Sequence, residues 1–264
     1  MDRTRLKNII LLILLLMNAV LLCSLASVRG QERSARERTA RELTELFASE
    51  DIALEARIPS SLPPASVTLS RDLDGDRALA AALLGDDLTM SNEGGGIYIF
   101  TSSAGQALFR SNGVFEATGT LARSDAEAVC RKFCQAFGYQ DLTLDPDSGT
   151  GSAVQYFDGY PVSNASVDFA VSGGSLVSVS GAHLPQTASA SVSGGSMSAV
   201  TALTKFLNAR RDSGAVVSAV TEVYLCYELQ STAAAPMSLV PAWCVVTDTG
   251  NYYVNCLTEA VTRS

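Results

Sequence analysis

The chain has 264 residues, with 19 Lys and Arg against 27 Asp and Glu, giving a formal net charge of -8. Because a protein that binds nucleic acid needs a basic surface to neutralise phosphates, this balance argues against DNA or RNA as a partner. The more than 200 residues that follow the N-terminal region are enough for one sizeable core or for two or three small modules.

The first 28 residues have the pattern of a membrane anchor. Arg3, Arg5 and Lys7 lie in residues 1–7, and residues 8–28 contain no charged side chain. Twenty helical residues rise by about 30 Å, which matches the hydrocarbon core of a bilayer. The sequence therefore predicts a cytoplasmic tail at 1–7 and a single transmembrane helix at 8–28. Long domains translocate largely regardless of charge, so we expect a single-pass protein of the cell membrane with an extracytoplasmic C-terminal domain.

Two alternatives to a permanent anchor exist. A signal peptide could be cleaved near Ser24–Ala26, and a lipoprotein could be formed at Cys23. The apolar run is longer than the roughly 7 to 15 residues of a signal peptide, and Leu21–Leu22 precedes Cys23 where small residues are expected. Retention of the segment is therefore the preferred interpretation.

Residues 29–48 are predicted to form a juxtamembrane stalk helix. Leu43, Leu46 and Phe47 recur near helical spacing among Arg and Glu residues, which is typical of an amphipathic helix. A plain spacer is the alternative. Pro59 and Pro63–Pro64 prevent the helix from continuing, so the chain becomes extended there.

Residues 49–120 read as a β-rich segment. Apolar and polar residues alternate at 97–101 and 107–110, on either side of a turn, which predicts a small meander of hairpins. Gly113 and Phe115 continue this meander. The acidic run Asp72–Asp76 resembles the start of a calcium loop, but the position of its glycine and the absence of a closing glutamate do not fit. We interpret it as a solvated acidic turn.

A first helix-plus-sheet module is predicted at residues 121–185. Ser124–Glu127 has the form of a capping box, and the helix that follows ends at Gly138. Its apolar face would be formed by Val129, Cys130, Phe133, Cys134 and Phe137. Strands are expected at 153–157, 166–171 and 176–180, with a hairpin turn at 172–175.

The same order of elements returns at residues 196–264. A helix starts at Ser196 or Ser198, and Lys205–Phe206 follows Lys132–Phe133 at a fixed offset. Strands are expected at 220–229, 242–247 and 252–257. The predicted fold class is thus α+β: one transmembrane helix, then a mostly antiparallel β domain containing two repeated helix-plus-three-strand modules.

The inventory of reactive residues does not predict an enzyme. His183 is the single histidine, and the sequence contains no hydrolase, phosphate-loop or zinc-protease motif. A Cys/His pair would require His183 to approach one of the cysteines that follow the span, which are Cys130, Cys134, Cys226, Cys244 and Cys256. Those cysteines lack the spacing of a metal site. We therefore predict no catalytic residues, no cofactor and no metal, and we expect Trp243 and Tyr252 to belong to the core.

Asn18 is the one polar side chain deep within the predicted span. An amide in lipid gains by hydrogen bonding to another helix, which makes it a candidate for partner recognition. The equally weighted alternative is that the apolar surroundings simply tolerate one amide.

Several of these segments resemble the YycI family, whose members are membrane-anchored auxiliary regulators of the WalK/WalR two-component system. The N-terminus resembles it in Met1–Asp2, the basic Arg5 and Lys7, the Ile/Leu run and Asn18. Three later segments are similar to YycI-like and PepSY-like modules; these are Tyr156–Val162, Leu239–Trp243 and Gly250–Asn255.

This resemblance implies a regulatory, non-catalytic protein with duplicated PepSY-like extracytoplasmic modules. The implied partners are a WalK-like sensor histidine kinase, a YycH-like protein and the membrane. The residues implied for the helix–helix contact are Asn18, Leu11, Leu14, Leu15, Leu22 and Leu25. Contacts that favour one signalling state of the kinase by about 1 to 3 kcal/mol would change its output roughly 5- to 150-fold.

The alternative function is a PepSY-type inhibitor of an extracytoplasmic peptidase. Inhibition of such a peptidase by the exported domain without its anchor would favour that class.

Overall fold

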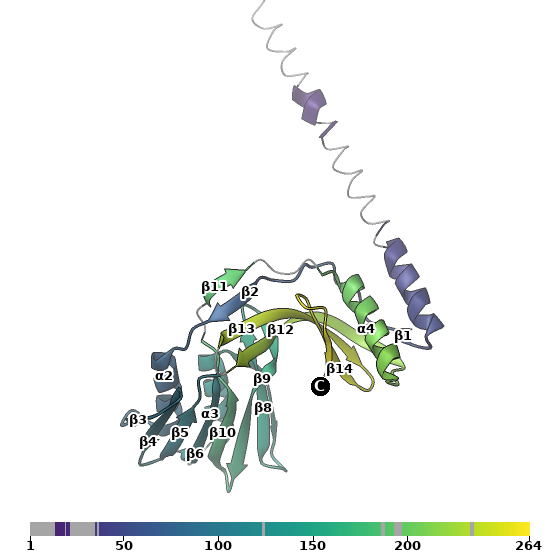
Figure 1. Ribbon diagram of the computed structural model, residues 1–264. Helices are drawn as coiled ribbons and strands as arrows, with labels where there is room; N and C mark the ends of the chain where they lie inside the picture. Colours follow the sequence, from purple (N-terminus) through teal and green to yellow (C-terminus); the bar gives the residue numbers. More distant parts are fainter. Residues whose placement is uncertain are drawn as a thin grey trace, which may run out of the picture.

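The computed structural model describes residues 14–18, 20–21, 35, 37–122, 125–185, 188–192, 197–232 and 235–264. Within these residues, fifteen strands join into one mixed sheet, which bends into an arch in Figure 1. The helix at 37–49 and α4 (Ala199–Ser213) lie at one end of the arch. Helices α2 (Leu73–Leu84) and α3 (Ala126–Phe137) lie at the other end, and the C-terminus lies beneath the arch.

The elements divide into two halves, each with its own core. The terminal half contains the helix at 37–49, α4, β1 (Ala53–Leu54), β2 (Ser66–Leu69), β11 (Ala188–Val192), β12 (Ala219–Thr232), β13 (Ala235–Thr247), β14 (Gly250–Asn255) and β15 (Val261–Arg263). The middle half contains α2, α3, β3 (Thr89–Gly94), β4 (Ile97–Ser102), β5 (Gly105–Phe109), β6 (Val114–Ala122), β7 (Tyr139–Asp145), β8 (Thr150–Phe157), β9 (Tyr160–Ser172) and β10 (Ser175–Ala182).

Strand β9 joins the two halves. The main strand order is β11-β2-β13-β12-β9-β10-β6-β5-β4-β3, with β14 and β15 added beside β13 and with β8 and β7 beside β9. β9 pairs with β12 in parallel at Val162 and Tyr227 and with β10 in antiparallel from Val167 to Ser172. A small cluster at this seam contains Phe157 and Tyr227, whose rings meet edge to face with centroids 6.0 Å apart.

Helix α3 forms where the sequence predicts it. Asp125 caps its start by accepting a hydrogen bond from the Ala128 amide at 3.1 Å, and Gly138 ends it in a left-handed conformation. The buried face includes Phe133, which stacks on Tyr139 and meets Phe169 edge to face. The cap is therefore Asp125; Ser124, the first residue of the predicted capping box, lies outside the described residues.

The acidic run at 72–76 is not a solvated turn, as the sequence suggested, but the start of α2. Asp72 caps the helix by accepting a hydrogen bond from the Asp74 amide at 3.1 Å. Asp76 is buried and pairs with Arg71 at 2.9 Å. Burial raises the pKa of Asp76 by more than the Arg71 guanidinium lowers it. The sequence did not indicate this helix, because the Asp and Gly residues at its start are also the usual residues of turns.

The predicted fold class is wrong in its modular organisation. The chain is not built from two repeated helix-plus-three-strand modules, because α3 is followed by five strands and α4 by four, and all of these strands belong to one mixed sheet. The unpredicted α2 begins a third run of one helix and four strands, β3 to β6. The parallel pairs β1–β12 and β9–β12 connect segments that a modular interpretation keeps apart.

The structure also gives no support to the helical span in the predicted fold class. Among the described residues, no helix is both long and apolar enough to cross a bilayer. Most of residues 8–28 lies outside the described residues, which include only 14–18 and 20–21 of that range.

Many predicted strands and the predicted hairpin turn at 172–175 are confirmed. β4 and β5 form the hairpin expected around 97–110, and β8, β9 and β10 include the strands expected in 153–180. β12, β13 and β14 correspond to the strands expected at 220–229, 242–247 and 252–257. The last of these strands ends at Asn255 and not at Leu257. Ser198 is the N-cap of α4.

Gly119 provides a test of the β5–β6 packing. It pairs with Gly105 across the strands, its φ is +146°, and a Cβ there would lie 2.2 Å from the carbonyl oxygen of Ala104. We expect Gly119→Ala to lower the free energy of unfolding by about 3 kcal/mol or more. Gly173→Ala is the control, because Gly173 also has positive φ but faces open space, and it should cost about 1 kcal/mol. Equal losses in urea titrations of the two variants would contradict this packing.

Candidate functional site

The helix at 37–49 is part of the folded domain. Leu43 and Phe47 are one turn apart, so they share a face, and they are 4% and 0% exposed. The Phe47 ring stacks on Phe206 of α4 with centroids 6.2 Å apart, and Phe206 meets Tyr252 of β14 at 4.9 Å. The predicted stalk helix thus completes the core of the terminal half.

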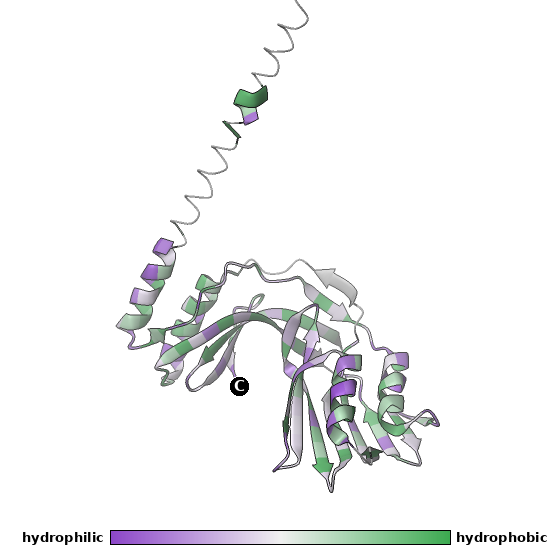
Figure 2. Ribbon diagram, turned by 180° about the vertical axis from the view of Figure 1, so that it is seen from behind, coloured by the Kyte–Doolittle hydropathy of each residue, from purple (hydrophilic) through white to green (hydrophobic). Residues whose placement is uncertain are grey.

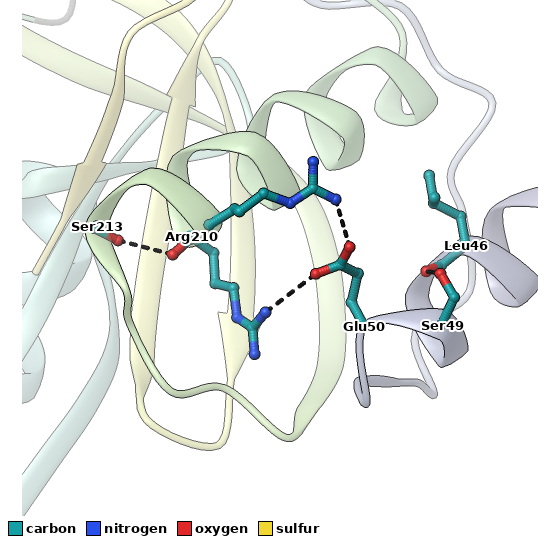
Figure 3. Close-up of polar contacts among 6 residues, drawn as sticks. Leu46, Ser49, Glu50, Arg210 and Ser213 are labelled. Atoms are coloured by element: carbon teal, nitrogen blue, oxygen red, sulfur yellow. Dashed lines mark hydrogen bonds and ion pairs between the residues drawn. The ribbon is translucent and has the colours of Figure 1, made fainter.

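Glu50 holds the end of this helix against α4 (Figure 3). Its two carboxylate oxygens accept hydrogen bonds from Arg210, at 3.4 Å, and from Arg211. Both Arg210 and Glu50 have side chains about one-fifth exposed, so partial burial keeps this pair less screened than a surface ion pair. The next residues form β1, in which Ala53 pairs in parallel with Ala219 of β12. We call the contacts of Phe47 and Glu50 with α4 the helix junction.

A cavity of about 720 Å³ lies beside the helix junction. It is lined by the helix at 37–49, by residues 54–60 and by the first turn of α4. Its lining is mainly apolar, with Glu37 and Arg57 as its charged residues. This cavity has a size that suits small molecules, but its charges do not point to one class of ligand.

Three of the N-terminal site residues predicted from the sequence are described, and they are not part of either core. Leu14, Leu15 and Asn18 are in a described helical stretch, which Figure 2 colours as mostly hydrophobic, and Leu14 and Leu15 are 55% and 62% exposed. The Asn18 side-chain amide donates to the Leu14 carbonyl at 3.0 Å. One of its donors is therefore satisfied within its own helix, and its carbonyl oxygen has no hydrogen-bond donor among the described residues. Leu11, Leu22 and Leu25 lie outside the described residues.

A second cavity, of about 550 Å³, opens at the seam between the two halves. Its walls come from β7, β8 and β9 of the middle half and from β12 and β14 of the terminal half. Four half-buried tyrosines line it, namely Tyr156, Tyr160, Tyr224 and Tyr253. Two exposed carboxylates, Asp141 and Glu222, are also in the lining. We call this cavity the tyrosine groove.

Asp141 is set in the groove by an irregular backbone. It has a φ of +55°, and the pairing of β7 with β8 shifts register between Gln140 and Thr143. Bulges of this kind redirect side chains, and here the Asp141 carboxylate accepts a hydrogen bond from the Tyr156 hydroxyl at 2.8 Å. Burial, followed by this hydrogen bond and the Asp141 charge, raises the pKa of Tyr156 to about 12. The tyrosine therefore stays neutral and keeps its donor proton.

The terminal wall of the groove is formed by β12 and β14, which lie on either side of β13 in the sheet. Cys226 and Cys244 are buried on one face of these three strands, with Tyr224 and Tyr253 packed beside them. Residues on alternate positions point the other way, so Trp243 faces α4, where its indole donates to the Met197 carbonyl at 3.0 Å. Trp243 and Tyr252 are core residues, as predicted.

The five described cysteines are free and buried. Burial raises the pKa of Cys130 and of Cys134 to about 11 and that of Cys256 to about 12, and it also raises those of Cys226 and Cys244. Their thiols are protonated at neutral pH, which makes them poor nucleophiles. Cys130 and Cys134 act as small core residues, as predicted from the helix pattern.

His183 is buried near the seam. Its ring meets Phe137 edge to face at 5.7 Å, its amide donates to the Gly113 carbonyl at 2.8 Å, and its Nδ1 has no hydrogen-bond partner among the described residues. Burial lowers its pKa to about 4, a shift only partly opposed by Asp72. The imidazole is therefore neutral at pH 7 and packs against Phe137, and none of its contacts among the described residues is with a thiol.

Within the described part of the chain, no group of three or more His, Cys, Asp or Glu residues has the arrangement of a metal site.

Neither a family model nor a curated protein sequence matches this chain. One similar solved structure is an uncharacterized protein from Eubacterium rectale ATCC 33656, with 12% identity and a TM-score of 0.44. The match covers 81% of this chain and 86% of that chain. A likeness at this TM-score carries no inference about function.

Sequence reasoning missed the two sites that the fold assembles. Glu50 and Arg210 are 160 positions apart, and no local pattern relates them. Asp141 and Glu222 likewise come from separate halves. The alternation of Glu222, Tyr224 and Cys226 was a usable signal, because alternate residues of a strand share one face.

The helix junction can be tested by a pair of neighbouring substitutions. We expect Phe47→Ala to lower the free energy of unfolding by about 3 to 5 kcal/mol, because it leaves a cavity against Phe206. Leu46→Ala is the matched control, since Leu46 is 41% exposed on the same helix, and it should cost less than about 1 kcal/mol. Urea titration of both variants measures the difference. Similar small losses would place the helix outside the core.

His183 should make the stability of the protein depend on pH. Its pKa falls from the usual 6.5 to about 4 on folding, so protonation favours the unfolded chain. The stabilisation is complete above about pH 6.5 and is lost as the pH falls towards 4. Between these limits the wild type should lose about 3 kcal/mol more than His183→Leu. Parallel pH profiles of the two proteins in urea titrations would contradict the assignment.

Proposed function

We propose that this chain is an auxiliary regulator of a sensor histidine kinase that acts by protein contact. The observation that carries the proposal is the helix junction, in which Phe47 and Glu50 attach the N-terminal part of the chain to α4. Such a regulator contacts the kinase through its N-terminal helix and binds a partner through its exported domain. A movement of the domain must therefore be transmitted to the helix. Packed aromatic rings and partly buried ion pairs provide a connection that transmits movement, because they resist sliding more than a solvated linker does.

The resemblance of the sequence to the YycI family supplies the identity of the partner. In this proposal, the kinase and a YycH-like protein contact the N-terminal helix through Asn18 and its apolar neighbours. The remaining carbonyl of Asn18 accepts a hydrogen bond from the partner helix. The location in a cell membrane, with the N-terminus in the cytoplasm, rests on the sequence alone.

Mechanistically, the regulator shifts the balance between two kinase states. A contact that differs between these states by about 1 to 3 kcal/mol is enough to change output about 5- to 150-fold. The helix junction gives the domain a means to bias that contact, since binding to the domain changes which orientations of the helix are favoured.

The experiment is photocrosslinking in the native cell with a photoreactive residue at position 14 or position 18. We expect capture of a sensor histidine kinase or a YycH-like protein. Asn18→Leu, combined with the probe at position 14, should reduce capture at least about threefold, because a helix–helix amide hydrogen bond is worth about 0.6 to 2 kcal/mol. Phe47→Ala should leave capture intact and change the expression of a reporter gene controlled by the kinase.

The absence of any captured kinase or YycH-like protein would contradict the proposal. Inhibition of an extracytoplasmic peptidase by the purified chain, with no change in the reporter, would instead support the inhibitor class.

A further inference from the structure

We infer that the tyrosine groove is a docking site for a positively charged peptide segment of a partner protein. This inference goes beyond the proposed function, because it concerns a different surface and does not depend on the partner being a kinase. It rests on the shape, aromatic lining and charge of the groove.

The groove has the dimensions of a peptide site. Its volume of about 550 Å³ is enough for a few side chains, and it lies between strands of two different halves. The four tyrosines that line it are only half buried, so ring surface stays open to a ligand. Tyrosine combines an apolar ring with a hydrogen-bonding hydroxyl and loses little conformational entropy on binding, which is why it is enriched in binding surfaces.

The charge of the groove selects the class of ligand. Asp141 and Glu222 contribute carboxylates from opposite walls, and none of the described residues that line the groove is Lys or Arg. On the neighbouring strand β15, Arg263 lies over the ring of Tyr252, with the guanidinium carbon 5.5 Å from its centroid. Tyr252 belongs to the core on the α4 side of the sheet, so this cation is directed away from the groove.

A guanidinium or ammonium group fits both features of the lining. Carboxylates form charge-assisted hydrogen bonds with it, and tyrosine faces attract it through their quadrupole. Asp141 already accepts the Tyr156 hydroxyl through Oδ2, which leaves Oδ1 for a ligand. The whole chain carries a net charge of -8, so a basic partner is also drawn to it from a distance.

The test uses the purified full-length chain and dye-labelled peptides at physiological salt. The probes are a peptide of alternating arginine and serine and a matched peptide of alternating glutamine and serine. We expect the arginine peptide to bind at least about tenfold more tightly by fluorescence anisotropy. Glu222→Gln combined with Asp141→Asn should weaken its binding about tenfold.

Matched variants separate the effect of the groove residues on binding from the effect of the net charge of the chain. Glu93→Gln combined with Asp147→Asn removes the same charge from exposed positions that are not in the groove lining, and it should change the affinity less than about twofold. Tyr224→Leu, which removes one ring and no charge, should weaken binding about threefold or more. Equal weakening by the two charge-removing pairs, or no binding of the arginine peptide by the wild type, would overturn the inference.

Discussion

The structure depends on the closure of the terminal core by the two ends of the domain. Phe47 comes from the first folded helix, whereas Phe206 and Tyr252 come from the last quarter of the chain, and the three rings are packed together without solvent. The whole middle half, which has a core of its own, lies between these parts in the sequence. The entropy of closing a loop of this length must be offset by burial at the junction, which is a reason for its aromatic and ionic contacts.

The second constraint is the seam at β9. Its first residues pair with β12 and its last residues pair with β10, so one strand belongs to both halves of the sheet. The tyrosine groove lies where this shared strand passes from one half to the other, and neither half alone forms it. Pairing across the seam therefore positions the candidate peptide site.

Local features of the fold were predictable from sequence, because they rest on signals within a few residues. The apolar face of α3 and the glycine that ends it, the hairpin at 172–175 and the Ser198 cap of α4 belong to this class. Helix α2 was missed because its cap and first turn consist of residues that also form turns. Only the burial of Asp76 and its pairing with Arg71 distinguish this helix start from a turn, and both depend on tertiary structure.

Features that join distant segments were not predictable in this way. The apparent repetition of helix and strands suggested independent modules, but hydrophobic periodicity does not say which strand pairs with which. The parallel pairing of β12 with both β1 and β9 is an example of strand pairing that periodicity does not determine. The candidate sites have the same origin: Glu50 with Arg210 and Asp141 with Glu222 are neighbours only after folding. Sequence reasoning directed attention to Asn18, whereas the fold adds the helix junction and the groove.

Amide hydrogen exchange on the native full-length chain tests the central claim most directly. If the helix at 37–49 completes the terminal core, the amides of residues 43–49 should exchange with opening free energies close to those of α4, because the two open together. Exchange of these amides at rates close to those of an isolated short helix, with α4 still protected, would contradict the account.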